Sequence, residues 1–167
     1  MTDLERPPRI EVIRSAKRKR TVAARLVGDV LEVRIPSRMS KADEQLYVTK
    51  LADKIARTHR SAGVDVLARA EALARRHRLP QPASVQWSAN QHSRWGSCTP
   101  SRGEIRVSNR LADFPPWVLD YVLVHELAHL VEASHSPAFW TLVARYPKAE
   151  RARGYLMAKG LEADDDG

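Results

Sequence analysis

The chain has 167 residues, enough to bury one hydrophobic core but few for two independent domains. Hydrophobic residues make up 43% and charged residues 29%, which is ordinary for a soluble globular protein, and no apolar stretch approaches the roughly 18 residues that cross a bilayer. Residues 1–8 hold no apolar segment that could act as a secretory signal, and the single cysteine, Cys98, excludes an intrachain disulfide. We therefore expect a cytoplasmic protein without a membrane partner.

The first 80 residues are predicted to form a small sheet followed by two helices. Short runs rich in β-branched residues predict strands at 10–14, 21–26 and 30–35, which we expect to pair as an antiparallel meander. Ser40 followed by Asp43 resembles the N-cap of a helix that reaches about Arg60, and a second helix is predicted at 64–77. We expect this part to belong to the same compact unit as the rest of the chain.

Basic residues form two clusters in this chain of net charge +8. The first cluster lies in the N-terminal hairpin region and consists of Arg14, Lys17, Arg18, Lys19, Arg20 and Arg25. The second lies at the end of the second predicted helix and consists of Arg75, Arg76 and Arg78. Phosphate contacts at the basic N-terminal hairpin would make nucleic acid or a nucleotide a partner. Because no aromatic residues are interleaved with these charges, a solvated surface is the default interpretation.

The acidic tail, 161–167, is expected to be disordered.

The second part of the chain, 81–160, is predicted to begin with strands and continue as helices. Strands are predicted at Ser84–Ser88 and Glu104–Ser108, with a turn at 95–97 between them. A helix should begin around 115–116 and end near Ala133, and one or two more should lie between Pro137 and about Lys159. Glu104–Ser108 is the candidate edge strand for a bound peptide, and an interior strand is the alternative.

The run His125-Glu126-Leu127-Ala128-His129 is an HExxH motif. Residues four apart share one face of a helix about 6 Å apart along its axis, so both imidazoles can reach one metal ion. Glu126, offset by about 100°, can instead address a water molecule. The flanking residues are apolar on nearly every side, which predicts a buried helix, and a bound metal would compensate the burial of these polar groups.

A catalytic zinc site needs a third protein ligand, and two residues compete for the role. His135 is the preferred candidate, because Ser136 is a predicted N-cap and Pro137 the first residue of the next helix, so His135 should lie in the connection between helices. Glu132 shares the helical face of His125 and His129 and is the alternative. Glu132 also replaces the glycine of the metzincin pattern HExxHxxGxxH, which argues against that class and favours a helix one turn longer.

Several other residues could line the site or be structural. These residues lie around the predicted strand Glu104–Ser108 and the HExxH motif, and they are Arg94, Trp95, Ser97, Asn109, Tyr121 and Trp140. Trp140 is expected to pack against the motif helix as part of the apolar surroundings of the metal. His59, His77 and His92 have no metal-ligand spacing and are interpreted as surface or capping residues.

Four segments together resemble the YgjP-like metallopeptidase family, which is similar to the SprT-like and WLM metalloproteases. They are 93–98 (SRWGSC), 105–111, 121–130 (the HExxH helix) and 135–140 (HSPAFW). The resemblance implies an α+β zincin-like fold with the metallopeptidase core at 81–160. It also implies one zinc ion held by His125, His129 and His135, with Glu126 as the catalytic base.

The sequence thus predicts a zinc-dependent metallopeptidase that acts on peptides or proteins. Metal-dependent hydrolysis of a nucleotide or phosphoester by the same residues is one alternative. A basic nucleic-acid-associated protein with a structural metal is another, although a purely structural site gains nothing obvious from Glu126 beside an open coordination position. The sequence does not predict an oligomeric state.

Overall fold

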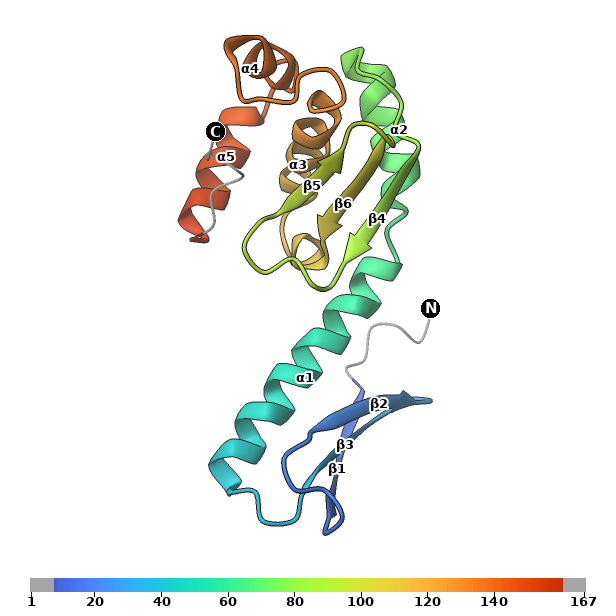
Figure 1. Ribbon diagram of the computed structural model, residues 1–167, viewed down its shortest axis with the longest axis vertical. Helices are drawn as coiled ribbons and strands as arrows, with labels where there is room; N and C mark the ends of the chain where they lie inside the picture. The colour runs from blue at the N-terminus through green and yellow to red at the C-terminus, as the bar shows by residue number, and fades with distance from the viewer. Residues whose placement is uncertain (1–7, 161–167) are drawn as a thin grey trace. The chain divides into compact units, whose positions relative to one another are not determined.

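The computed structural model describes residues 8–160, in which five α-helices and two three-stranded sheets are present (Figure 1). This mixture confirms the predicted α+β class. Contacts between residues divide the chain into two units, Met1–His59 and Arg60–Gly167. The acidic tail, 161–167, whose disorder was predicted, lies outside the described residues.

The sheet of the first unit is mixed, so the predicted antiparallel meander is wrong. Its strands β1 (Arg9–Ser15), β2 (Ala23–Val27) and β3 (Val30–Pro36) lie in the order β1-β3-β2. β2 pairs with β3 antiparallel, whereas β1 pairs with β3 in parallel. The central strand, β3, is the most apolar of the three, and its Leu31, Val33 and Ile35 are completely buried. The connection formed by residues 16–22 is long enough to carry the chain from β1 across β3 to β2.

Helix α1 (Lys41–Ala62) supplies the apolar partner of this sheet. Ser40 begins the helix as predicted, since its Oγ accepts a hydrogen bond of 3.1 Å from the Asp43 N–H. The α1 side chains that pack against the buried residues of β3 are Val48, Leu51, Ala52 and Ile55. Their spacing of three and four residues is that of one helical face.

The sheet of the second unit has the strand order β4-β6-β5, from β4 (Ser84–Ser88), β5 (Gly96–Thr99) and β6 (Glu104–Ser108). β6 is the central strand, so the expectation that Glu104–Ser108 is an edge is wrong. It pairs with β4 in parallel and with β5 antiparallel, and its Ile105 and Val107 are buried. Residues 95–97, predicted as a turn, instead lead into the edge strand β5, and the tight turn comes at Gly103, whose φ is +64°.

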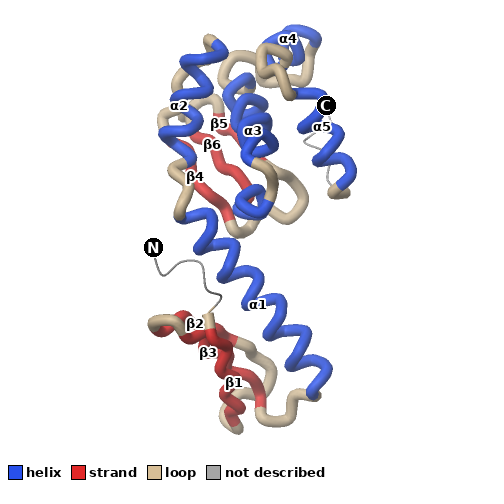
Figure 2. The backbone as a smooth tube through the Cα atoms, turned by 180° about the vertical axis from the view of Figure 1, so that it is seen from behind, coloured by secondary structure: helices blue, strands red, loops and turns tan. Residues whose placement is uncertain are grey.

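Helices α2 (Val66–His77) and α3 (Pro116–Ala128) pack side by side on one face of this second sheet (Figure 2). Helices α4 (Pro137–Val143) and α5 (Ala149–Ala158) pack against α3. Ten of the 13 residues of α3 are buried, as the apolar sequence around the HExxH motif predicted. α3 is therefore the centre of the second unit.

The two units meet in sequence between His59 and Arg60, within α1, whereas the sequence suggested a division near residue 80. The difference comes from α2, which packs against α3 and β4 and so belongs to the second unit. That both parts form one compact body stays a prediction. Among the described helices, none has both the length and the apolar character needed to span a membrane.

Candidate metal centre

Three histidines come together where α3 ends and α4 begins, and we call them the histidine cluster: His125, His129 and His135. His125 lies within α3 and is 2% exposed, His129 is the C-cap residue of that helix, and His135 lies in the connection to α4. The Nε2 atoms of His125 and His135 are 3.3 Å apart. One potential ligand atom from each histidine lies within 4.8 Å of the others.

The connection that carries His135 begins earlier than predicted, because α3 ends at Ala128 and not near Ala133. The N–H groups of Leu130 and Val131 bond to carbonyls three residues back, at 3.1 and 3.0 Å. This tighter winding ends the regular helix one turn early. The chain is then free to turn, and it places His135 against the two imidazoles of the motif.

Glu132, the alternative to His135, contributes its backbone to the site. Its carbonyl oxygen lies 3.0 Å from Nδ1 of His129. Because a carbonyl can only accept, this contact assigns the ring proton of His129 to Nδ1 and leaves the lone pair of Nε2 for a metal. The carboxylate of Glu132 accepts a hydrogen bond of 3.3 Å from Ser134 Oγ and is not part of the histidine cluster.

Burial keeps the histidine at the centre of the cluster neutral. It lowers the pKa of His125 to about 3, and the electrostatic influence of the neighbouring His129, His135 and Arg153 adds to the effect. A metal ion binds only the neutral form of an imidazole, so His125 is in the protonation state that coordination requires.

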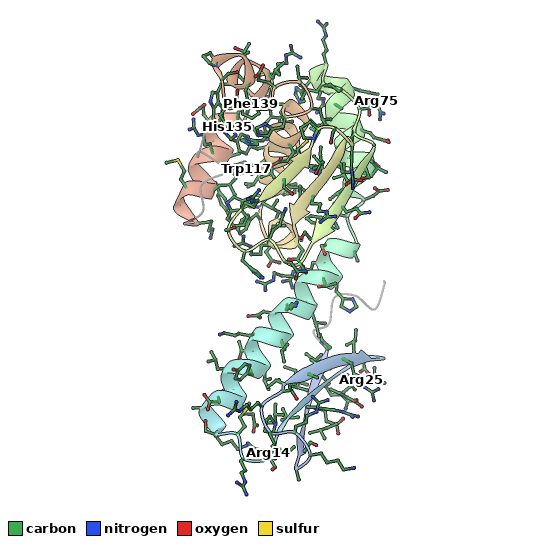
Figure 3. All side chains as sticks on the ribbon, viewed as in Figure 1. Arg14, Arg25, Arg75, Trp117, His135 and Phe139 are labelled. Carbon is green, nitrogen blue, oxygen red and sulfur yellow. The ribbon has the colours of Figure 1, made fainter. Side chains whose placement is uncertain are left out.

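Phe139, which the sequence analysis did not single out, packs against every ring of the histidine cluster. Its ring is stacked on His129 at 4.4 Å and meets His125 and His135 edge to face at 4.9 and 4.8 Å. Ser136 fixes its position, since Oγ of this predicted N-cap accepts the Phe139 N–H at 3.2 Å. Figure 3 shows Phe139, which belongs to α4, close to His135. The aromatic residue three positions after the N-cap is the signal that could have identified it.

Trp140 completes the apolar side of the site, as predicted. Its ring is stacked on His135 at 5.8 Å and meets His125 at 6.1 Å. Tyr121 is 1% exposed and meets the His125 ring at 6.0 Å. The histidine cluster is thus surrounded by aromatic rings, which fix the orientation of the imidazoles and limit their contact with water.

Glu126 is 3% exposed and lies directly against the backbone of β5. A Cβ atom added to Gly96 would lie only 2.4 Å from Glu126 Oε1, so only glycine allows this approach. Cys98, two residues along the same strand, has its thiol pKa raised to about 11 by burial and by the nearby charge of Glu126. Because residues 95–97 were predicted as a turn, Gly96 was not recognised as a glycine within a strand, which signals close approach of another group.

The loop that leads into β5 is held by Arg110. Its guanidinium lies 4.3 Å from the Trp95 ring centre and donates to the carbonyls of Gln91, His92 and Arg94 at 3.1 to 3.4 Å. Trp95 itself is a core residue, 2% exposed. Trp95 is therefore part of the core that supports this loop.

Of the remaining candidates, Arg94 is exposed and Asn109 is buried at the start of a short 3-10 helix. Ser97 Oγ accepts a hydrogen bond of 2.7 Å from Gln91. His77 is also buried, 8% exposed, against the Tyr146 ring, so of the two interpretations, surface or capping, the surface position is wrong; His77 is the last residue of α2.

A model of the YgjP-like metallopeptidase domain matches residues 34–159, from β3 to the end of α5. The chain belongs to this family. Membership in the YgjP-like family implies a bound metal ion, and the histidine cluster is the group of residues that could hold it. No match to the chain was found among proteins of curated function.

Among solved structures, this YgjP-like chain is similar to abylysin from Pyrococcus abyssi, which is described as a metallopeptidase zymogen. The TM-score is 0.51 at 21% sequence identity, over 57% of this chain and 95% of that chain. At this identity the likeness shows the fold alone, which is zincin-like, as predicted.

Proposed function

We propose that the protein is a zinc-dependent metallopeptidase in which His125, His129 and His135 hold the ion. The observation that carries this proposal is the distance of 3.3 Å between the Nε2 atoms of His125 and His135. Two nitrogens bound to one tetrahedral zinc ion at about 2.0–2.1 Å lie about 3.3–3.4 Å apart. The donor set therefore fits zinc, and three imidazoles leave a fourth position open.

A zinc ion in such a site polarises the scissile carbonyl and lowers the pKa of water toward about 7. Glu126, held against Gly96, is the proposed general base. Its carboxylate takes the proton of the attacking water and returns it to the leaving amine. Phe139 and the carbonyl of Glu132 hold the imidazoles in place, so the geometry exists before substrate binds.

The substrate is proposed to be an extended peptide that lies along β5. In the described sheet β5 pairs with β6 alone, so its other edge offers backbone groups to a further strand. β5 also contacts α3, which carries Glu126. A peptide on this edge would have its backbone next to the general base. We also propose a cytoplasmic location, because a chain with one cysteine needs no oxidising compartment.

Metal analysis and peptide hydrolysis test the proposal together. Wild-type protein should bind about one zinc ion per chain, and His129→Ala or His135→Ala should sharply weaken this binding. Glu132→Ala is the matched control, because it keeps the backbone carbonyl and should retain zinc. Glu126→Gln should bind zinc and lose peptide hydrolysis by a factor of about 100 or more, since an amide cannot act as a base.

Two results would contradict the proposal. One is full zinc stoichiometry in His135→Ala together with its loss in Glu132→Ala, which would exchange the ligands. The other is metal-dependent phosphate release from nucleoside triphosphates without cleavage of any peptide, which would replace the substrate class and keep the site.

A further inference from the structure

A cavity of about 300 Å³ lies beside the histidine cluster, between three helices. α3 contributes Tyr121, α4 contributes Trp140 and Val143, and α5 contributes Ala149, Glu150 and Arg153. Two of these residues also touch the cluster, because Trp140 is stacked on His135 and Tyr121 meets His125. The cavity therefore shares two walls with the proposed reaction site.

Two charged residues, the half-buried Arg153 and the exposed Glu150, line the otherwise uncharged wall of the cavity. The guanidinium of Arg153 lies 4.5 Å from the ring centre of Trp140, a cation–π contact that favours this position. Glu150, one helical turn earlier, is exposed, so water screens its charge more strongly than that of Arg153. A planar guanidinium in such surroundings pairs best with a carboxylate, which can accept two parallel hydrogen bonds.

The ring distances limit how far this cation lies from the histidine cluster. The Trp140 ring is 5.8 Å from the His135 ring and 4.5 Å from the Arg153 guanidinium. The guanidinium is thus within about 10 Å of His135, a span of about three extended residues at 3.3–3.6 Å each. A peptide cleaved at the cluster could place a group one to three residues from the cut against Arg153.

We propose that this cavity is a specificity pocket in which Arg153 binds a carboxylate of the peptide substrate. The inference rests on the proposed peptidase function and adds the chemistry that the enzyme selects. The carboxylate belongs either to an Asp or Glu side chain or to the carboxyl terminus of the peptide. Both sources present the same chemical group to Arg153.

Cleavage of a peptide library by the zinc-loaded enzyme tests this pocket. A tryptic digest of a denatured protein mixture serves as the library, and mass spectrometry identifies the cut sites. We expect Asp, Glu or a free carboxyl terminus to be enriched within three residues of the cut. Arg153→Gln should remove this enrichment, and Arg153→Lys should keep part of it. Arg151→Gln is the matched control, because Arg151 is on the same helix and lies 4.7 Å from the ring of Trp117, outside the cavity lining.

A cleaved peptide is then synthesised in four forms, with Glu or Gln at the enriched position and with a free or amidated carboxyl terminus. Arg153→Gln should lower kcat/KM about tenfold to a hundredfold for the form that carries the recognised carboxylate, and less than about twofold for the form that lacks it. Loss with Gln identifies a side chain as the source, and loss with the amide identifies the carboxyl terminus. Glu150→Gln removes a negative charge from the cavity wall, so it should leave the preference for substrates with a carboxylate unchanged or strengthen it.

Equal losses for all four peptides in Arg153→Gln, or the same profile in Arg153→Gln and Arg151→Gln, would contradict the specificity pocket. So would wild-type cleavage without any preference for a carboxylate. These outcomes leave the proposed peptidase intact. Absence of all peptide cleavage by the zinc-loaded wild type would instead contradict the peptidase proposal, and the pocket with it.

Discussion

At the scale of single residues, Gly96 decides whether the edge strand and the active-site helix can meet. The carboxylate of Glu126 occupies the space that a side chain at this position would need. Glu126 is buried, so it has little room to move aside. The position of the proposed general base thus depends on a residue that has no side chain of its own.

Gly96→Ala should therefore reduce activity without removing the metal. The added methyl group would displace Glu126 from its position, and loss of a general base costs about 100-fold or more in kcat. The histidine cluster is built from α3 and the loop before α4, so zinc stoichiometry should remain near one. Gly154→Ala is the control, because nothing lies within 4 Å of a Cβ added there. Equal peptide hydrolysis by the two variants would show that Glu126 can work from a displaced position.

The sequence revealed the residues of the candidate site that follow a local rule. His125, Glu126 and His129 are recognisable because their spacing matches one helical turn, and His135 because it precedes an N-cap and a proline. Phe139 and Arg153 are placed near the histidine cluster by packing contacts, which depend on ring orientation or on neighbours distant in sequence. Their contribution becomes visible only once α4 and α5 are packed against α3.

At the scale of elements, local signals located most of the strands and helices, with β5 missed as a turn, but did not identify which strands pair. Ser40, Ser136 and the prolines marked helix starts that the structure confirms. Strand pairing is decided by burial across the whole unit, so the central places of β3 and β6 were missed. The early end of α3 comes with the tighter bonds of Leu130 and Val131 and with the contact between His129 and the Glu132 carbonyl, none of which helix propensity describes.

Helix α4 should control metal affinity through Phe139. Phe139→Leu keeps an apolar side chain but removes the flat ring that orients the histidine cluster, so zinc affinity should fall about 10–100-fold. Phe114→Leu is a suitable control, because Phe114 packs against the rings of Trp95 and Tyr155 in the same unit. Competition with a chromogenic chelator measures both. If the two variants bind zinc equally well, the imidazoles do not need the support of α4.

At the scale of the whole molecule, most of the net positive charge belongs to the first unit and the candidate metal centre to the second. Residues 1–59 contain 14 basic and eight acidic residues, a net charge of +6 of the total of +8. The histidine cluster and Glu126 belong to the second unit. Neither the family nor the similar solved structure points to a nucleic-acid partner, so the role of the basic cluster around the connection from β1 to β2 stays a prediction.

The stability of the metal-free protein should fall as the pH drops below about 6.5, partly because of His77. Burial, assisted by the charge of Arg76, lowers the pKa of His77, although a backbone contact with Arg145 and the charge of Asp120 oppose this shift. The unfolded chain takes up a proton near pH 6.5, while folded His77 stays neutral to lower pH. Stability is therefore complete above the unfolded pKa and is lost as the pH falls toward the folded one.

His77→Phe should reduce this loss, because phenylalanine fills the space beside Tyr146 and binds no proton. The effect on the free energy of unfolding cannot exceed about 1.4 kcal/mol per pH unit, the slope for one proton. Thermal unfolding of both proteins between pH 5 and 7 measures the difference, and His125 contributes equally to each. His59→Phe, at an exposed position, is the control. An unchanged pH slope in His77→Phe would show that folded His77 takes up its proton over the same pH range as the unfolded chain.

The contact between His129 and the carbonyl of Glu132 has a consequence for how sequences of this kind can vary. A substitution at position 132 exchanges the side chain and leaves the carbonyl in place, so an alanine scan would score the position as tolerant. An insertion or deletion between His129 and His135 would move the carbonyl and the third imidazole together. Natural variants should therefore preserve the length of this turn more strictly than its composition.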